Sequence, residues 1–216
     1  MIWCDLDSTL VYTWTPLLGA APIPTWLAIA DVDPPLPESG FRQVAVRGLD
    51  EPCWTKLRPG ALEFLAALRE LAPTRLLTYS ARPYALAMNR TFGLGFRPRE
   101  IVARDDLRKA FRASVLAVDP AGVMVDDDDR DNYRERGTKI EYLGLDPRAV
   151  VRVAMYDRYL AAGRFSDDFR DRVPTYLARI SQALKGEHPV PQPSPEPDPS
   201  FDPLEVFARL QRESRK

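Results

Sequence analysis

The sequence contains a single histidine, His188, which lies in a proline-rich stretch near its C-terminal end. Catalysis by a histidine-based triad, a histidine-rich zinc site and a phosphohistidine mechanism are therefore all disfavoured. Cysteine is also scarce, since only Cys4 and Cys53 are present. We expect Cys4 to be a small buried side chain and Cys53 a surface thiol, and such cysteine usage is typical of a cytoplasmic protein, or a nuclear one in a eukaryote.

Long apolar runs and an excess of charge of one sign are absent as well. No uninterrupted apolar run reaches the roughly 18–20 residues of a membrane span, and no basic leader precedes the first apolar segment. The net charge is −1, with 30 basic and 31 acidic residues, so no global basic field favours nucleic acid or a membrane surface. A local basic patch, and with it nucleic-acid binding, stays open but is not indicated.

The chain begins with a short apolar segment, Ile2 to Cys4, followed at once by Asp5 and Asp7. Carboxylates directly after a buried strand lie at the carboxyl end of that strand, where open α/β sheets bind their ligands. Two acids this close repel each other unless a cation lies between them, and oxygen ligands of this kind suit Mg²⁺. A solvated turn is the alternative for this stretch taken alone.

Two later stretches repeat the pattern of an apolar strand that ends in polar groups. Residues 74–77 lead to Thr78 and Ser80, just before a helix that begins near residue 83. Hydroxyl groups there can bind a phosphoryl oxygen, and we expect Ser80 to cap the helix and Thr78 to remain for phosphate. Residues 123–125 lead directly into four aspartates, 126–129, which indicate either a cation site or a solvated acidic loop.

The remaining pattern predicts one elaborated domain and a tail. We expect a long loop at 12–40 and a β-hairpin from strands at 41–47 and 53–57. Apolar spacing predicts helices at 61–72, 83–92, 107–116 and 167–184, the last kinked or split at Pro174, and strands at 101–102, 140–143 and 150–154. The predicted units are a domain over 1–185 with a loop and hairpin insertion at 12–57, a proline-rich linker at 186–203, and a short helix or tail at 204–216.

Three segments in this order, DLDSTLV (5–11), LLTYS (76–80) and VMVDDDD (123–129), resemble the motifs of the haloacid-dehalogenase-like superfamily. The likeness is greatest to the NLI-interacting-factor-like branch, which contains the phosphatases that act on the C-terminal domain of RNA polymerase II. KLRPG (56–60) is similar to a further segment of that branch. The chain departs from it at Ser8, where the branch has an acidic residue, and in its longer 12–40 loop.

The resemblance implies a role for each motif residue. Asp5 would be the nucleophile that forms a phosphoaspartyl intermediate, and Asp7 the general acid and base. Thr78 would bind a phosphoryl oxygen. Asp126 and Asp127 would complete a Mg²⁺ site with Asp5 and the backbone carbonyl of Asp7.

The family also has a lysine before its last motif, which neutralises phosphoryl charge. Lys109 is the only lysine between Thr78 and Asp126, so it is the candidate here. A solvated helix lysine is the alternative, and Arg104 or Arg108 could supply the positive charge instead.

We therefore expect a three-layer α/β/α sandwich with a mostly parallel central sheet, a small hairpin insertion and no large cap domain. The function expected from the motifs is Mg²⁺-dependent hydrolysis of phosphomonoesters, with a phosphorylated protein as substrate because the site would be open. The alternatives are phosphorylated nucleic-acid ends, small phosphorylated metabolites, or a binding module with weak catalysis. The intact Asp5 and Asp7 pair argues against the last of these.

Overall fold

The computed structural model of the chain describes residues 1–14, 40–50, 52–112, 122–127, 149–156, 158–161, 163 and 166–187. Several sequence predictions fall outside these residues. They are most of the 12–40 loop, the strand at 140–143, Asp128 and Asp129, the C-terminal part of the helix at 107–116, nearly all of the linker at 186–203, and the helix or tail at 204–216.

A five-stranded parallel sheet forms the centre of the protein. Its strands lie in the order β6 (Ile101–Val102), β5 (Thr74–Leu77), β1 (Ile2–Cys4), β7 (Val123–Asp126) and β8 (Val150–Arg152). The middle strand β1 is fully apolar and buried, as expected for a parallel strand covered on both faces. The chain therefore enters the centre of the sheet within its first few residues.

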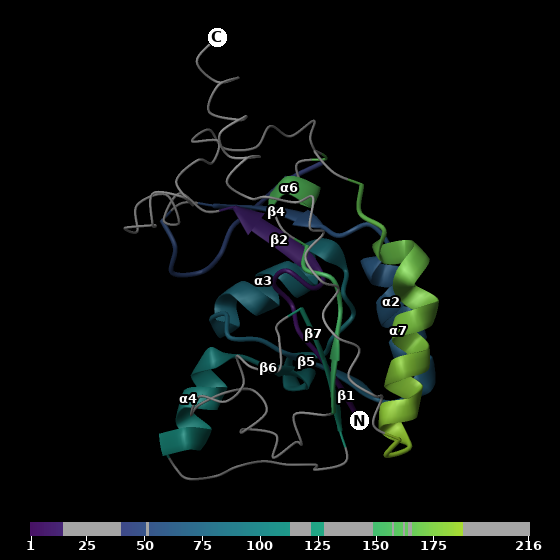
Figure 1. Ribbon diagram of the computed structural model, residues 1–216. Coiled ribbons are helices and arrows are strands. Elements are labelled where there is room, and N and C mark those ends of the chain that lie inside the picture. The colour runs from purple at the N-terminus through teal and green to yellow at the C-terminus, as the bar shows by residue number, and fades with distance from the viewer. Residues whose placement is uncertain are drawn as a thin grey trace, which may run out of the picture.

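Helices cover both faces of this sheet (Figure 1). On one face, α2 (Ala61–Leu71) and α7 (Phe169–Leu184) lie side by side, and on the other lie α3 (Arg82–Phe92) and α4 (Arg104–Arg112). The short helices η2 (Pro98–Glu100) and α6 (Arg158–Ala161) complete the described elements. The predicted three-layer α/β/α sandwich is confirmed, and none of the described helices has the length and apolar character needed to cross a membrane.

A second, smaller sheet lies beside the end of the central sheet where β1 terminates. It is antiparallel, in the order β2 (Val11–Trp14), β4 (Cys53–Leu57) and β3 (Arg42–Val44). The predicted hairpin is thus confirmed as β3 and β4, but the prediction of a loop from residue 12 was wrong at its start. Residues 11–14 form a strand because they pair with β4, whose residues lie forty or more positions from their partners and which local periodicity does not reveal.

The prediction of a surface thiol at Cys53 was wrong, and of the two outcomes predicted at Pro174, a kink or a split, the split does not occur. Cys53 is buried, since β4 turns it toward the core beside Val44, and this burial together with the charge of Asp7 raises the pKa of its thiol. The helix predicted to be kinked or split at Pro174 is one continuous element, α7. Pro174 is the sixth residue of α7, so it removes one backbone hydrogen bond, the one to the carbonyl of Arg170, near the N-terminal end of the helix.

Candidate active site

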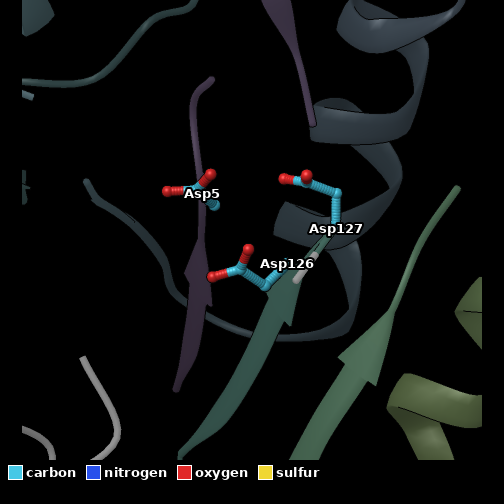
Figure 2. Close-up of side chains that lie close together, drawn as sticks. All are labelled: Asp5, Asp126 and Asp127. Atoms are coloured by element: carbon cyan, nitrogen blue, oxygen red, sulfur yellow. The ribbon is translucent and has the colours of Figure 1, made fainter. Parts of the chain in front are cut away.

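Three carboxylates meet at the carboxyl ends of β1 and β7 (Figure 2). Asp5 follows β1, Asp126 ends β7, and Asp127 follows it, and all three side chains are buried. One oxygen of each lies within 4.8 Å of the others, which is the spacing of groups that can share a metal ion. The structure therefore brings together the three predicted side-chain ligands.

The parallel pairing of β1 with β7 explains why residues 121 positions apart meet. Cys4 lies opposite Val125, and the Asp5 backbone amide donates to the Val125 carbonyl at 2.9 Å. On the other side of β7, the Val153 amide donates to the Asp126 carbonyl at 2.9 Å. Both acids thus leave the sheet from backbones that are held by hydrogen bonds, which fixes where their side chains begin.

The turn after β1 ties the first motif to the third. Ser8 adopts a φ of 60°, which lets the chain reverse and return as β2. The buried Thr9 hydroxyl then donates to Asp127 Oδ1 at 3.0 Å. Sequence reasoning assigned no role to Thr9, although its place in the Asp-x-Asp-x-Thr pattern was the signal that could have revealed it. Thr9 orients Asp127, as the groups around a metal ligand commonly do.

Asp7 lies apart from the three clustered carboxylates and is surrounded by hydroxyl groups. Its Oδ2 accepts from Ser80 Oγ at 2.5 Å and from Thr78 Oγ1 at 3.4 Å, and its Oδ1 accepts from Tyr84 Oη at 2.5 Å. The prediction that Ser80 caps α3 was therefore wrong. The residue before α3 is Ala81, whose methyl side chain cannot cap the helix, and the Ser80 hydroxyl donates to Asp7 instead.

An open cavity of about 530 Å³ connects these groups. Its lining includes every predicted acid as well as Thr78 and Ser80, and it adds exposed apolar side chains, Leu49 and Tyr79. The residues that line it are Asp5, Asp7, Leu49, Thr78, Tyr79, Ser80, Ala81, Tyr84, Arg104, Asp126 and Asp127.

The positive charge in this lining comes from Arg104 among the described residues. Arg104 begins α4, and its backbone amide donates to the Ser80 carbonyl at 3.1 Å, so α4 starts beside the cavity. Lys109 and Arg108 are exposed further along α4 and are not among the lining residues. The structure thus does not bring Lys109 into the group formed by Asp5, Asp7 and Thr78.

The donor set fits a hard divalent cation. Three buried carboxylates within 4.8 Å of one another repel unless positive charge lies among them. Carboxylate oxygens with room left for water and a phosphate are the ligands that Mg²⁺ prefers. The cavity beside the cluster gives that room.

No protein-family model and no curated protein matches the chain. Among solved structures, a variant of the fission yeast RNA polymerase II CTD phosphatase Fcp1, bound to beryllium fluoride, is similar at 16% identity and a TM-score of 0.46. A structure of Fcp1 described as an essential RNA polymerase II CTD phosphatase is similar at 16% identity and a TM-score of 0.44. Each similarity covers 98% of this chain but only 61% of the Fcp1 chain.

Proposed function

We propose that the chain is a Mg²⁺-dependent phosphomonoesterase of the haloacid-dehalogenase-like superfamily that uses Asp5 as its nucleophile. The observation that carries the proposal is one cavity lined by both predicted kinds of acid. These are the clustered carboxylates of Asp5, Asp126 and Asp127, and the separate, hydroxyl-bound carboxylate of Asp7. Phosphoryl transfer needs mainly positioning and charge neutralisation, which these groups and Arg104 supply without a histidine.

The reaction would proceed in two balanced steps. In the first, an Asp5 oxygen attacks phosphorus, the bond from phosphorus to the leaving-group oxygen breaks, and Asp7 gives its proton to that oxygen. In the second, water attacks the phosphorus of the phosphoaspartate while Asp7 takes a proton from the water. The bond from phosphorus to Asp5 then breaks, and phosphate leaves. Bound Mg²⁺, held by Asp5, Asp126, Asp127 and the Asp7 carbonyl, would offset the negative charge of the phosphoryl oxygens.

The substrate that this site favours is a phosphorylated protein. The cavity is open, and the exposed Leu49 and Tyr79 on its lining could contact the residues that flank a phosphorylated side chain. An enclosed pocket that buries most of its ligand's surface would instead favour a small metabolite. The motif resemblance to the branch that contains protein phosphatases points the same way.

The test of this proposal is hydrolysis of 4-nitrophenyl phosphate with and without Mg²⁺. We expect turnover in Mg²⁺ that falls at least about 100-fold in EDTA and returns when Mg²⁺ is added in excess, because the clustered acids are repulsive without a cation. Beryllofluoride, a phosphate mimic, should inhibit in the presence of Mg²⁺. Folded protein that neither binds Mg²⁺ nor responds to beryllofluoride would contradict the proposal.

The residue that neutralises phosphoryl charge can be identified by a pair of matched substitutions. Arg104 lines the cavity, whereas Lys109 is the candidate from sequence spacing and lies exposed on α4. We expect Arg104→Gln to lower kcat/KM about 100-fold, as for loss of one donor to a reacting oxyanion, and Lys109→Gln to lower it less than about threefold. The reverse order would assign the role to Lys109.

A further inference from the structure

A chain of hydroxyl groups runs from the small sheet to Asp7. Tyr84 Oη of α3 lies 2.5 Å from Asp7 Oδ1, and Thr13 Oγ1 of β2 lies 2.5 Å from Tyr84 Oη. Thr55 Oγ1 of β4, which is fully buried, lies 2.9 Å from Thr13 Oγ1. The elements α3, β2 and β4 carry none of the predicted catalytic residues. Together they form one chain of hydroxyl groups that ends at Oδ1 of Asp7.

The direction of every bond in this chain is fixed by its end. Oδ1 of Asp7 accepts both when the carboxyl group is ionised and when it carries its proton on Oδ2, so Tyr84 donates to Asp7, and each hydroxyl has a single proton to give. Thr13 must then donate to Tyr84, and Thr55 to Thr13. Burial, and after it the negative charge of Asp7, holds the pKa of Tyr84 well above its usual value, so Tyr84 keeps the proton that it donates.

The two oxygens of Asp7 are held in different surroundings. Oδ1 accepts from Tyr84, which lines the cavity but is itself held by Thr13 and, through it, Thr55, neither of which lines the cavity. Oδ2 accepts from Ser80 and Thr78, which both line it. A substrate oxygen that enters the cavity can thus replace a hydroxyl at Oδ2, while the bond at Oδ1 stays in place.

We infer that Tyr84 is a positioning residue for Asp7, and that Thr13 and Thr55 orient Tyr84 in turn. By holding Oδ1, Tyr84 keeps Oδ2 directed at the leaving-group oxygen, which is where the proton must be delivered. Such a bond matters because a general acid needs its carboxyl group fixed by its neighbours, and the bridge between Asp7 and Val11 holds only the backbone. The inference rests on the proposed function and makes the small sheet part of the catalytic apparatus.

The test measures kcat/KM for a series of aryl phosphates whose leaving groups need progressively more protonation, from 4-nitrophenyl phosphate to phenyl phosphate. For Tyr84→Phe we expect a loss of about 10- to 100-fold with phenyl phosphate, because general acid catalysis contributes about 100-fold or more. With 4-nitrophenyl phosphate the loss should stay below about threefold. Thr13→Val should produce a weaker loss with the same dependence on the leaving group.

Two control variants make the same chemical changes elsewhere. Tyr156→Phe removes another buried tyrosine hydroxyl, and Thr74→Val removes a buried threonine hydroxyl at the opposite end of β5 from Thr78. Neither residue lines the cavity, so both variants should retain the leaving-group dependence of the wild type.

The outcomes that overturn the inference are distinct from those that overturn the function. A fall by the same factor for every leaving group, or no fall, in Tyr84→Phe would show that Tyr84 does not position the acid. If Thr13→Val kept the wild-type dependence of kcat/KM on the leaving group, the small sheet would have no part in positioning Asp7. Wild-type protein that hydrolyses none of the esters would contradict the proposed function itself.

Discussion

Asp5→Asn should abolish phosphatase turnover while leaving the protein folded. Asparagine has nearly the shape of aspartate, but its amide is a far poorer nucleophile than the carboxylate. We expect kcat with 4-nitrophenyl phosphate to fall about 10⁴-fold or more, the scale seen when an enzyme loses its nucleophile. No phosphorylated enzyme should be trapped when the variant is quenched with acid during turnover, whereas wild-type protein should give an acid-stable, hydroxylamine-sensitive adduct.

The same substitution should not weaken the fold in the absence of metal. Asp5 lies among buried carboxylates whose oxygens are within 4.8 Å of one another, so a neutral side chain removes two repulsive interactions. In EDTA, the free energy of unfolding of Asp5→Asn should therefore equal or exceed that of the wild type, as measured by urea denaturation. Asp171→Asn, an exposed change on α7, is the control for the loss of one negative charge.

Asp5→Asn with turnover within tenfold of the wild type would contradict the assignment of the nucleophile. If Asp7→Asn then removed activity, the carboxylates would have exchanged roles. A variant that unfolds in EDTA more easily than the wild type would contradict the repulsive cluster, because it would mean that Asp5 contributes favourable contacts that exceed the repulsion.

The parts of the site that sequence predicted are those encoded in local patterns. An apolar run that ends in acids occurs at both Asp5 and Asp126, and the carboxyl ends of neighbouring parallel strands necessarily lie together. Thr78 was predicted in the same way, because it is the first polar residue after the apolar end of β5. These positions could be predicted because a strand's end and its first polar residue are both visible in the sequence.

The parts that sequence did not predict depend on contacts between distant segments. Serine just before a helix is typical of a helix cap, yet the Ser80 hydroxyl donates to Asp7, because β1 and β5 are neighbours in the sheet. Thr13 was predicted to lie in a loop. Its partner in the sheet is Thr55, which is too far away in the sequence for a local pattern to reveal the pairing. The sequence left Lys109, Arg104 and Arg108 open as the source of positive charge, and of these the cavity lining includes Arg104, because α4 begins there.

Loss of the buried ion pair between Arg58 and Asp167 should destabilise the protein more than any change at its surface. Arg58 Nε and Nη2 each lie 2.8 Å from an oxygen of Asp167, and the two side chains are 0% and 8% exposed. The guanidinium also lies 4.0 Å from the ring centre of Phe169 and 5.3 Å from that of Tyr156. Arg58 is therefore enclosed by one carboxylate and two aromatic rings.

Asp167→Asn leaves the Arg58 charge buried without its counter-ion, and such a loss costs about 3–5 kcal/mol. We expect that decrease in the free energy of unfolding by urea denaturation. Glu63→Gln, which breaks the exposed ion pair between Glu63 and Arg170, should cost less than about 1 kcal/mol. Equal costs for the two variants would contradict the importance of the buried pair.

The pair should also affect metal binding, because Arg58 reaches the site through the backbone. Its Nη1 donates to the Thr9 carbonyl at 3.4 Å and to the Ala154 carbonyl, and the Thr9 hydroxyl donates to Asp127. We expect Asp167→Asn to lower Mg²⁺ affinity about 10-fold, as changes in groups that support metal ligands do. Mg²⁺ should then raise the stability of the variant less than that of the wild type at the same concentration.

A double substitution separates the cost of an unpaired charge from the value of the pair. Arg58→Met with Asp167→Leu replaces both charges by apolar groups that can fill the space beside Phe169, and such replacements are often close to neutral. We expect the double variant to be more stable than Asp167→Asn but to bind Mg²⁺ no better, since the bond to the Thr9 carbonyl is lost with the arginine. Recovery of stability without recovery of Mg²⁺ affinity would show that Arg58 is kept for the orientation of the site; recovery of both would assign the whole effect to the buried charge.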